Sequence, residues 1–352
     1  MRKAYIKNFG VYHKYAKDSS ALFDLVATRP LAINVPVEHY TIPKIDIVDL
    51  EIVKREDRAV LNTISKISIN ALVDLRHKTS LVPFSNSVLY SACDSEEHSF
   101  DTFREIAHKD VGCFWENLSD FNKLSNPLEM LRLLPTNPLY HISKILLNHE
   151  EGIPLRTASL SGMNALEMAH SDIVHHNTDQ GVLIISSANM LSFDSLTMFS
   201  KFGEIRENGT SESGIVPTWG GAILHLDHNE HDALAELVSV NIHYVPKAKY
   251  TQEDWLELFA EQKRQHGSPD IIISYDNGIT AQKTAEYDAI ERVFPTAKII
   301  NYKVITGYTG KLNNILDILC CLNDQTILTG TRVLFNGAGI NYGLGCVLLI
   351  KK

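Results

Sequence analysis

The sequence predicts an α/β protein made of two similar halves. Runs of apolar, often β-branched residues alternate with amphipathic segments along the whole chain. Many of these runs are continuous, which is typical of strands that helices cover on both faces. A polar, turn-rich stretch at 203–213 separates two series of such elements. We therefore expect an N-terminal half of residues 1–213 and a C-terminal half of residues 214–352.

The periodicity of apolar residues assigns the individual elements. Helical spacing predicts helices over 161–176 and 252–265, each with one apolar face. The apolar runs predict strands at the following positions: 4–12, 87–92, 155–160, 181–187, 221–227, 235–245, 270–276, 297–302, 332–337 and 346–352.

The composition excludes several classes of protein. Acidic residues number 42 and basic residues 33, and no Lys/Arg cluster stands out, so we expect no binding to nucleic acid. No segment approaches the roughly 18 apolar residues of a membrane span. The N-terminus also lacks the apolar run of a signal peptide. The cytoplasm is therefore the expected location.

No metal or cofactor is expected. The five cysteines are odd in number and show no CxxC spacing, which argues against a zinc site or a disulfide framework. His170, His175 and His176 lie around one predicted helix and lack metal-ligand spacing. The glycines at 337–341 precede a strand rather than a helix, so they do not form a dinucleotide-binding loop.

Five motifs carry the chemical information. The stretch LRTASLSGMNALEMA (155–169) predicts an extended run, a tight turn of small residues and then a helix, with Ser159 at the turn. Further along the chain come VPTWGGAILHLD (216–227), SYDNGITAQKTAEYDAIERVF (274–294), NYKVITGYTGKLNN (301–314) and LFNGAGINYGLG (334–345).

This ordered series resembles the β-ketoacyl synthases of the thiolase-like superfamily, the condensing enzymes of fatty acid and polyketide synthesis. The resemblance covers nearly the whole chain, most clearly from Asn137 onward. It implies a thiolase-like fold, in which two similar α/β halves pack as α-β-α-β-α layers.

The resemblance also places the catalytic positions. Ser159 stands where the family has its nucleophilic cysteine. Counting back eleven residues from Glu286 puts Tyr275 at the first catalytic histidine. Tyr308 stands at the second histidine, in a motif that keeps Lys303.

Other family positions are matched in part. Gly278 and Gly307 are kept in the two histidine motifs, and Gly339 and Asn341 are kept near the C-terminus. Trp219 replaces a glutamate of the family.

These replacements predict a loss of condensing activity. Condensation needs a thiolate to hold the acyl chain, and a serine hydroxyl needs a neighbouring base. Tyrosine titrates near pH 10, so at neutral pH it donates a hydrogen bond but is a poor base. Ser159 is open to three interpretations: a small residue that fits the turn, an acyl-accepting serine, or a ligand contact. Lys303 either lines the former site or is an ordinary surface or paired charge.

The leading hypothesis is a non-catalytic subunit of the chain-length-factor type. Such subunits pair with an active ketosynthase and shape the acyl tunnel, and the partner would engage the acyl carrier protein. One alternative is a serine acyltransferase or esterase that uses Ser159, and another is a homodimer that only binds an acyl chain. If the fold is kept for pairing, we expect the helix at 161–176 and an edge of the strand at 181–187 to lie at the dimer contact.

Overall fold

The computed structural model describes residues 2–32, 43–95, 127–150, 152–176, 180–201, 204–206 and 213–352. Its strands are β1 Ala4–His13, β2 Val88–Cys93, β3 Gly152–Pro154, β4 Val182–Asn189, β5 Trp219–Asp227, β6 Ala235–Tyr244, β7 Ile271–Ile273, β8 Lys298–Ile300, β9 Arg332–Gly339 and β10 Gly343–Lys351. Its α-helices are α1 Ser19–Thr28, α2 Thr63–Arg76, α5 Pro127–Leu133, α6 Asn137–Leu146, α7 Ser161–Val174, α8 Phe193–Lys201, α9 Gln252–His266, α10 Thr280–Val293, α11 Lys303–Thr306 and α12 Asn313–Asn323.

The strand order reveals an internal repeat. The order along the sheet is β3-β2-β4-β5-β1-β6-β10-β9-β7-β8. Read inward from the opposite end, β8-β7-β9-β10-β6 has the same arrangement as β3-β2-β4-β5-β1. Only Ala4, Tyr5 and Ile6 of β1 pair with β6, which joins the two groups. The two similar halves expected from the sequence are therefore present.

The strand order groups β5 with the first half, because β5 pairs with both β1 and β4. The repeat thus changes between β5 and β6, later in the chain than the predicted division at 213/214. Most of the polar stretch at 203–213 lies outside the described residues. As a boundary between domains, 213/214 stays a prediction.

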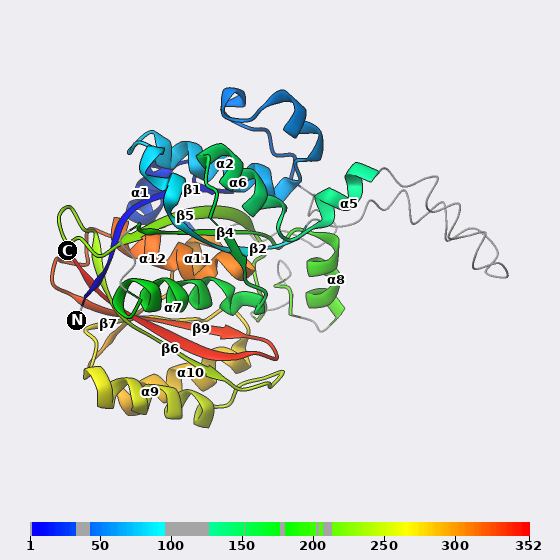
Figure 1. Ribbon diagram of the computed structural model, residues 1–352. Coiled ribbons are helices and arrows are strands. Elements are labelled where there is room, and N and C mark those ends of the chain that lie inside the picture. Colours follow the sequence, from blue (N-terminus) through cyan, green and yellow to red (C-terminus); the bar gives the residue numbers. More distant parts are fainter. Residues whose placement is uncertain are drawn as a thin grey trace, which may run out of the picture.

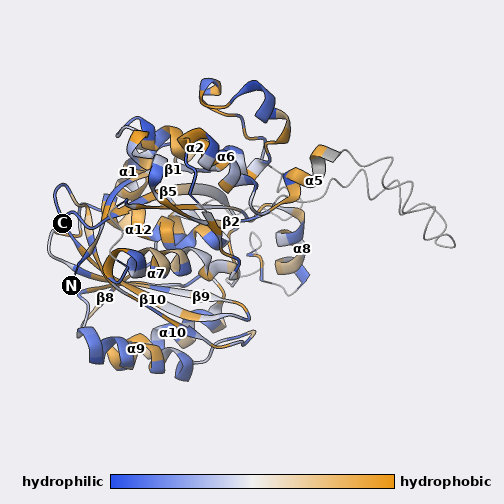
Figure 2. Ribbon diagram, viewed as in Figure 1, coloured by the Kyte–Doolittle hydropathy of each residue, from blue (hydrophilic) through white to orange (hydrophobic). Residues whose placement is uncertain are grey.

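The elements stack as five layers, α-β-α-β-α (Figure 1). The strands β3-β2-β4-β5-β1 form the first β-layer, or first sheet, and β6-β10-β9-β7-β8 form the second. Helix α2 packs on β1 and β5 and contacts α6, on the outer side of the first sheet. Helices α7 and α12 contact each other and lie between the two sheets, while α9 and α10 cover the outer face of the second. Strands β4 and β9 are buried along almost their whole length, and the outer side of α9 is hydrophilic (Figure 2), as expected for sheets that lie between helices. This confirms the predicted fold class.

Close approach of the layers depends on two glycines. A Cβ on Gly10 of β1 would lie 2.0 Å from the Ala71 carbonyl oxygen of α2. A Cβ on Gly162 of α7 would lie 3.0 Å from the Lys311 carbonyl oxygen, just before α12. Side chains at these positions would push the layers apart.

Two sequence-based expectations are wrong. The third strand is Gly152–Pro154, and residues 155–160, which were expected to form it, lead through a turn into α7. The pattern of apolar residues does not reveal this strand, because a short edge strand lacks the apolar run of a buried strand. The strand at 181–187 belongs to β4, which is buried along its length between β2 and β5 and is not an edge.

In the described part of the chain no helix is long and apolar enough to cross a bilayer.

Candidate functional site

Ser159 lies in a tight turn between β3 and α7. Ala158 adopts a φ of 49°, a left-handed conformation that is uncommon for a residue with a Cβ. A single turn of 3-10 helix then leads into α7. The buried Ser159 hydroxyl donates a 2.6 Å hydrogen bond to the Ala338 carbonyl oxygen on β9. Its proton is therefore directed at the backbone rather than at a base.

Tyr275 lies in the loop that joins β7 to α10, and Glu286 of α10 holds this loop. The Tyr275 and Asp276 N–H groups donate to the two carboxyl oxygens of Glu286, at 2.7 and 2.9 Å. The Asn336 side chain on β9 donates to the same carboxyl at 2.7 Å. Burial raises the pKa of Glu286 to about 7, against the opposing effect of these hydrogen bonds.

Tyr308 lies in the loop between α11 and α12. Its N–H donates to the Val216 carbonyl at 2.7 Å, and its own carbonyl accepts from the Thr218 N–H at 3.0 Å. The preceding Gly307 has a φ of 72°, and a Cβ there would lie 2.7 Å from the Val216 carbonyl oxygen. Glycine at this position therefore permits the turn that directs the Tyr308 ring inward.

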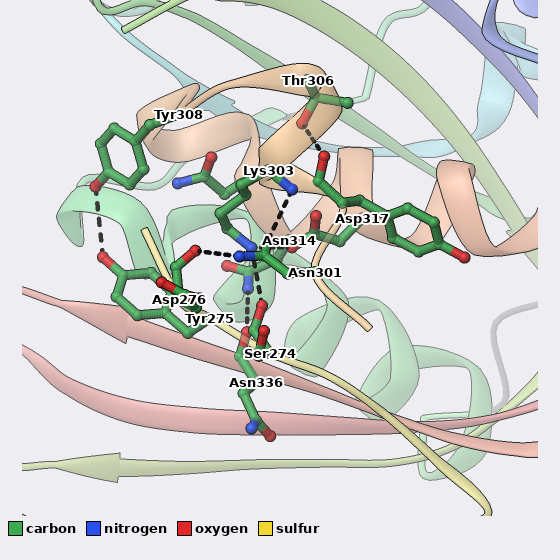
Figure 3. A network of polar contacts seen from close by, with 12 residues as sticks. Ser274, Tyr275, Asp276, Asn301, Lys303, Thr306, Tyr308, Asn314, Asp317 and Asn336 are labelled. Atoms are coloured by element: carbon green, nitrogen blue, oxygen red, sulfur yellow. Dashed lines mark hydrogen bonds and ion pairs between the residues drawn. The ribbon is translucent and has the colours of Figure 1, made fainter. Parts of the chain in front are cut away.

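Ser159, Tyr275 and Tyr308 meet in one place. The hydroxyl oxygens of Tyr275 and Tyr308 are 3.5 Å apart (Figure 3). Burial raises the pKa values of both phenols and outweighs the opposing effect of the nearby Ser159 hydroxyl. Both phenols are therefore neutral donors at physiological pH. Within the described ranges, no imidazole hydrogen-bonds to any of the three residues.

A side chain from α8 completes the group. The Phe199 ring is buried, and its centroid lies 5.8 Å from that of Tyr308 in an edge-on arrangement. Other residues of the same helix, such as Met198, are exposed. Phe199 could not be predicted as part of this group from the sequence, because nothing in the pattern of α8 singles out this ring.

Lys303 is the fourth predicted residue, and it is buried. Its ammonium donates to the Asp317 carboxylate of α12 at 2.5 Å and to the Ser274 carbonyl at 3.1 Å (Figure 3). It lies 5.8 Å from the centroid of the Tyr275 ring. Burial raises the pKa of Asp317, and the nearby Lys303 charge opposes that rise. Asp317 was also missed, although a lone acid inside the apolar run NILDILCCL was a usable signal.

The three histidines in the segment 161–176, which were not expected to bind a metal, lie elsewhere. His170 belongs to α7 and His175 and His176 follow at its C-terminal end, far along the helix from Ser159. His176 pairs with Asp172 at 3.0 Å. In the residues that the structure describes, no group of three His, Cys, Asp or Glu side chains is placed to hold a metal.

Comparison with known proteins gives the fold a name. No family model matches the chain, and no curated protein matches it. Solved structures, however, match its whole length. A β-ketoacyl synthase from Burkholderia phymatum STM815 superposes with a TM-score of 0.77 at 14% identity, covering 100% of both chains. The chain has the fold of the ketosynthases.

Two further ketosynthase structures match as well. The ishigamide ketosynthase/chain length factor has a TM-score of 0.77 at 13% identity, covering 100% of this chain and 99% of that one. A type II polyketide acyl-carrier protein in complex with its hexaketide-bound ketosynthase gives 0.74 at 15% identity, with coverage of 100% and 99%. This thiolase-like fold agrees with the resemblance found in the sequence motifs.

Proposed function

We propose that this chain is a non-catalytic, ketosynthase-like subunit that pairs in the cytoplasm with an active ketosynthase. The partner would supply the catalytic residues and engage the acyl carrier protein. The observation that carries the proposal is the meeting of three neutral hydroxyl groups, those of Ser159, Tyr275 and Tyr308. The motif resemblance assigns these residues to the positions of the family's cysteine and two histidines.

Neither step of condensation has a suitable group at this site. Acyl transfer needs an activated nucleophile, and the Ser159 proton is bonded to the Ala338 carbonyl. Decarboxylation of a malonyl unit needs donors that stabilise an enolate, and the two phenol hydroxyls are turned toward each other.

The same geometry disfavours a serine enzyme. A tyrosine can act as a base only if nearby positive charge lowers its pKa. Lys303 lies 5.8 Å from the centroid of the Tyr275 ring, but its ammonium is paired with Asp317, and burial keeps the pKa of Tyr275 well above 10. Ser159 therefore lacks a base that would activate it.

The pairing surface we propose is the edge of β3. Among the described strands β3 pairs only with β2, so no other described strand pairs with its outer side. Exposed apolar side chains lie on β3 and on the neighbouring α6 and its end, namely Ile153, Tyr140 and Leu147. Open edges with apolar neighbours promote aggregation unless a partner covers them.

Co-expression tests the proposal. The chain would be produced alone and together with a ketosynthase from a neighbouring gene that has an intact cysteine and two histidines. Light scattering of the purified material should give the mass of a one-to-one heterodimer. A stable monomer in every preparation would contradict the proposal. A homodimer that ignores all candidate partners would favour the acyl-binding alternative.

A further inference from the structure

Two exposed charges flank the edge strand β3. Glu150 precedes the strand and Arg156 follows it, and each lies three residues from Ile153 at its centre. In the described part of the chain neither side chain forms an ion pair. The strand therefore has a negative group before it, a positive group after it and an exposed apolar residue between them.

The backbone of β3 also presents hydrogen-bonding groups to the side away from β2. The two strands run parallel, and the Leu155 N–H donates to the Ser91 carbonyl at 2.7 Å. Because N–H groups alternate in direction along a strand, the groups of Ile153 also face β2, whereas the Gly152 N–H and the Pro154 carbonyl face outward. Pro154 has no N–H of its own. The outer side of β3 therefore offers both a donor and an acceptor.

A second copy of this strand complements the first when the two run antiparallel about a two-fold axis at Ile153. Each Gly152 N–H then lies opposite the Pro154 carbonyl of the other copy, which gives two hydrogen bonds. The two exposed Ile153 side chains face each other. Positions at equal distances on either side of the axis are also opposite, so each Glu150 faces the Arg156 of the other copy.

A neighbouring register lacks this charge complementarity. A two-fold axis at Gly152 would also give two backbone hydrogen bonds, between the two copies of Gly152. It would place Glu150 opposite Pro154, however, and leave both Glu150 and Arg156 without an oppositely charged partner. The flanking charges therefore favour the register centred on Ile153.

We propose that two copies of this chain pair through their β3 edges when the catalytic partner is absent, with Glu150 of each copy joined to Arg156 of the other. This inference rests on the proposed function, because a second copy and the ketosynthase then compete for one edge. The contact is small and Pro154 removes two of four backbone hydrogen bonds, so self-association is weak and reversible. A ketosynthase displaces the second copy by mass action. Until then, self-pairing protects the edge from aggregation.

Analytical ultracentrifugation of the full chain, from about 1 to about 100 µM, tests the self-pairing. Glu150→Arg and Arg156→Glu, made singly, each replace two attractive contacts of the symmetric pair by two repulsive ones. Each should raise the dissociation constant of the homodimer about tenfold. The double variant Glu150→Arg/Arg156→Glu restores opposite charges, and its dissociation constant should return to within about threefold of that of the unsubstituted chain. Glu257→Arg changes an exposed carboxyl on α9 and should leave the dissociation constant unchanged.

Two outcomes would overturn the proposal: a chain that stays monomeric at about 100 µM, or a double variant that pairs no more tightly than the single variants. Co-expression separates this result from that of the proposed function. A heterodimer that forms although the chain alone is monomeric refutes self-pairing and leaves the proposed function standing. A homodimer that the double variant restores, but that no candidate ketosynthase displaces, supports self-pairing and contradicts the proposed function.

Discussion

The phenol oxygens of Tyr275 and Tyr308 face each other at 3.5 Å, from two loops that each lead into a helix. Both rings are buried, and Phe199 packs against the second. Aromatic side chains thus fill the space between these two loops of the second half and join them. Tyr275 and Tyr308 therefore contribute to the packing of the second half.

Truncation of Phe199 tests this packing role. We expect Phe199→Ala to lower the free energy of unfolding by about 3 kcal/mol, because it leaves a cavity beside Tyr308. Met198→Ala removes an exposed side chain from the same helix and should cost less than about 1 kcal/mol. Urea denaturation measures both. Equal losses would show that Phe199 has no special place in the core.

The Lys303–Asp317 pair gives a second prediction. Lys303→Met leaves the Asp317 carboxyl buried without a cation and should cost about 3–5 kcal/mol. Combining it with Asp317→Leu should restore most of that loss, since neither charge is then buried alone. The exposed pair Lys352–Glu230 serves as a control, and Lys352→Met should cost less than about 1 kcal/mol. A double variant no more stable than Lys303→Met would contradict this account.

A buried imidazole predicts sensitivity to acid. Burial, helped by the charges of Lys17 and Lys14, lowers the pKa of His13 to about 3. The unfolded chain then binds a proton that the folded chain does not, so stability falls as the pH drops below about 6.5. From pH 7.5 to pH 5 the contribution of this residue should be a loss of about 2 kcal/mol.

Matched variants isolate that contribution. His13→Asn keeps an acceptor for the Tyr15 N–H, which bonds to His13 Nδ1, and should show a shallower acid slope. His231→Asn changes an exposed histidine and should keep the slope of the unsubstituted chain. Identical slopes for all three proteins would rule out His13 as the source.

Much of this fold could be predicted from the sequence, because each buried strand contains a continuous run of apolar residues. Nine of the ten expected strands overlap observed ones, and the exception is β3. That strand reads Gly-Ile-Pro, has no apolar run, and lies at an edge where little burial selects for one. For the same reason the sequence predicts a pairing edge at β4, which carries an apolar run because it lies in the centre of the sheet.

The site could be predicted from the sequence only where the chain keeps the spacing of the ketosynthase-like motifs. Ser159, Tyr275 and Tyr308 could be placed by counting from glycines and from Glu286, and the structure brings them together. The structural use of Glu286, with three donors on one carboxyl, depends on Asn336, which is 50 positions away along the chain. No local pattern encodes such a contact.

The pairing surface gives a fourth prediction. Ile153→Lys places an ammonium on the open edge of β3, where it should prevent a partner from covering the strand. The isolated chain should melt normally, because Ile153 is already exposed. Leu328→Lys alters another exposed apolar residue, between α12 and β9, and should leave pairing intact. Light scattering of the co-expressed proteins measures whether the heterodimer forms. A heterodimer that still forms with Ile153→Lys would contradict the assignment of the interface to the edge of β3.

Reconstituted condensation tests the central claim most directly. An active ketosynthase from a neighbouring gene would be assayed with malonyl-carrier substrate alone, with this chain, and with its Ser159→Ala variant. We expect this chain alone to give no turnover, the pair to condense, and Ser159→Ala to support condensation equally well. Turnover by the isolated chain that disappears in Ser159→Ala would contradict the account and identify a serine enzyme.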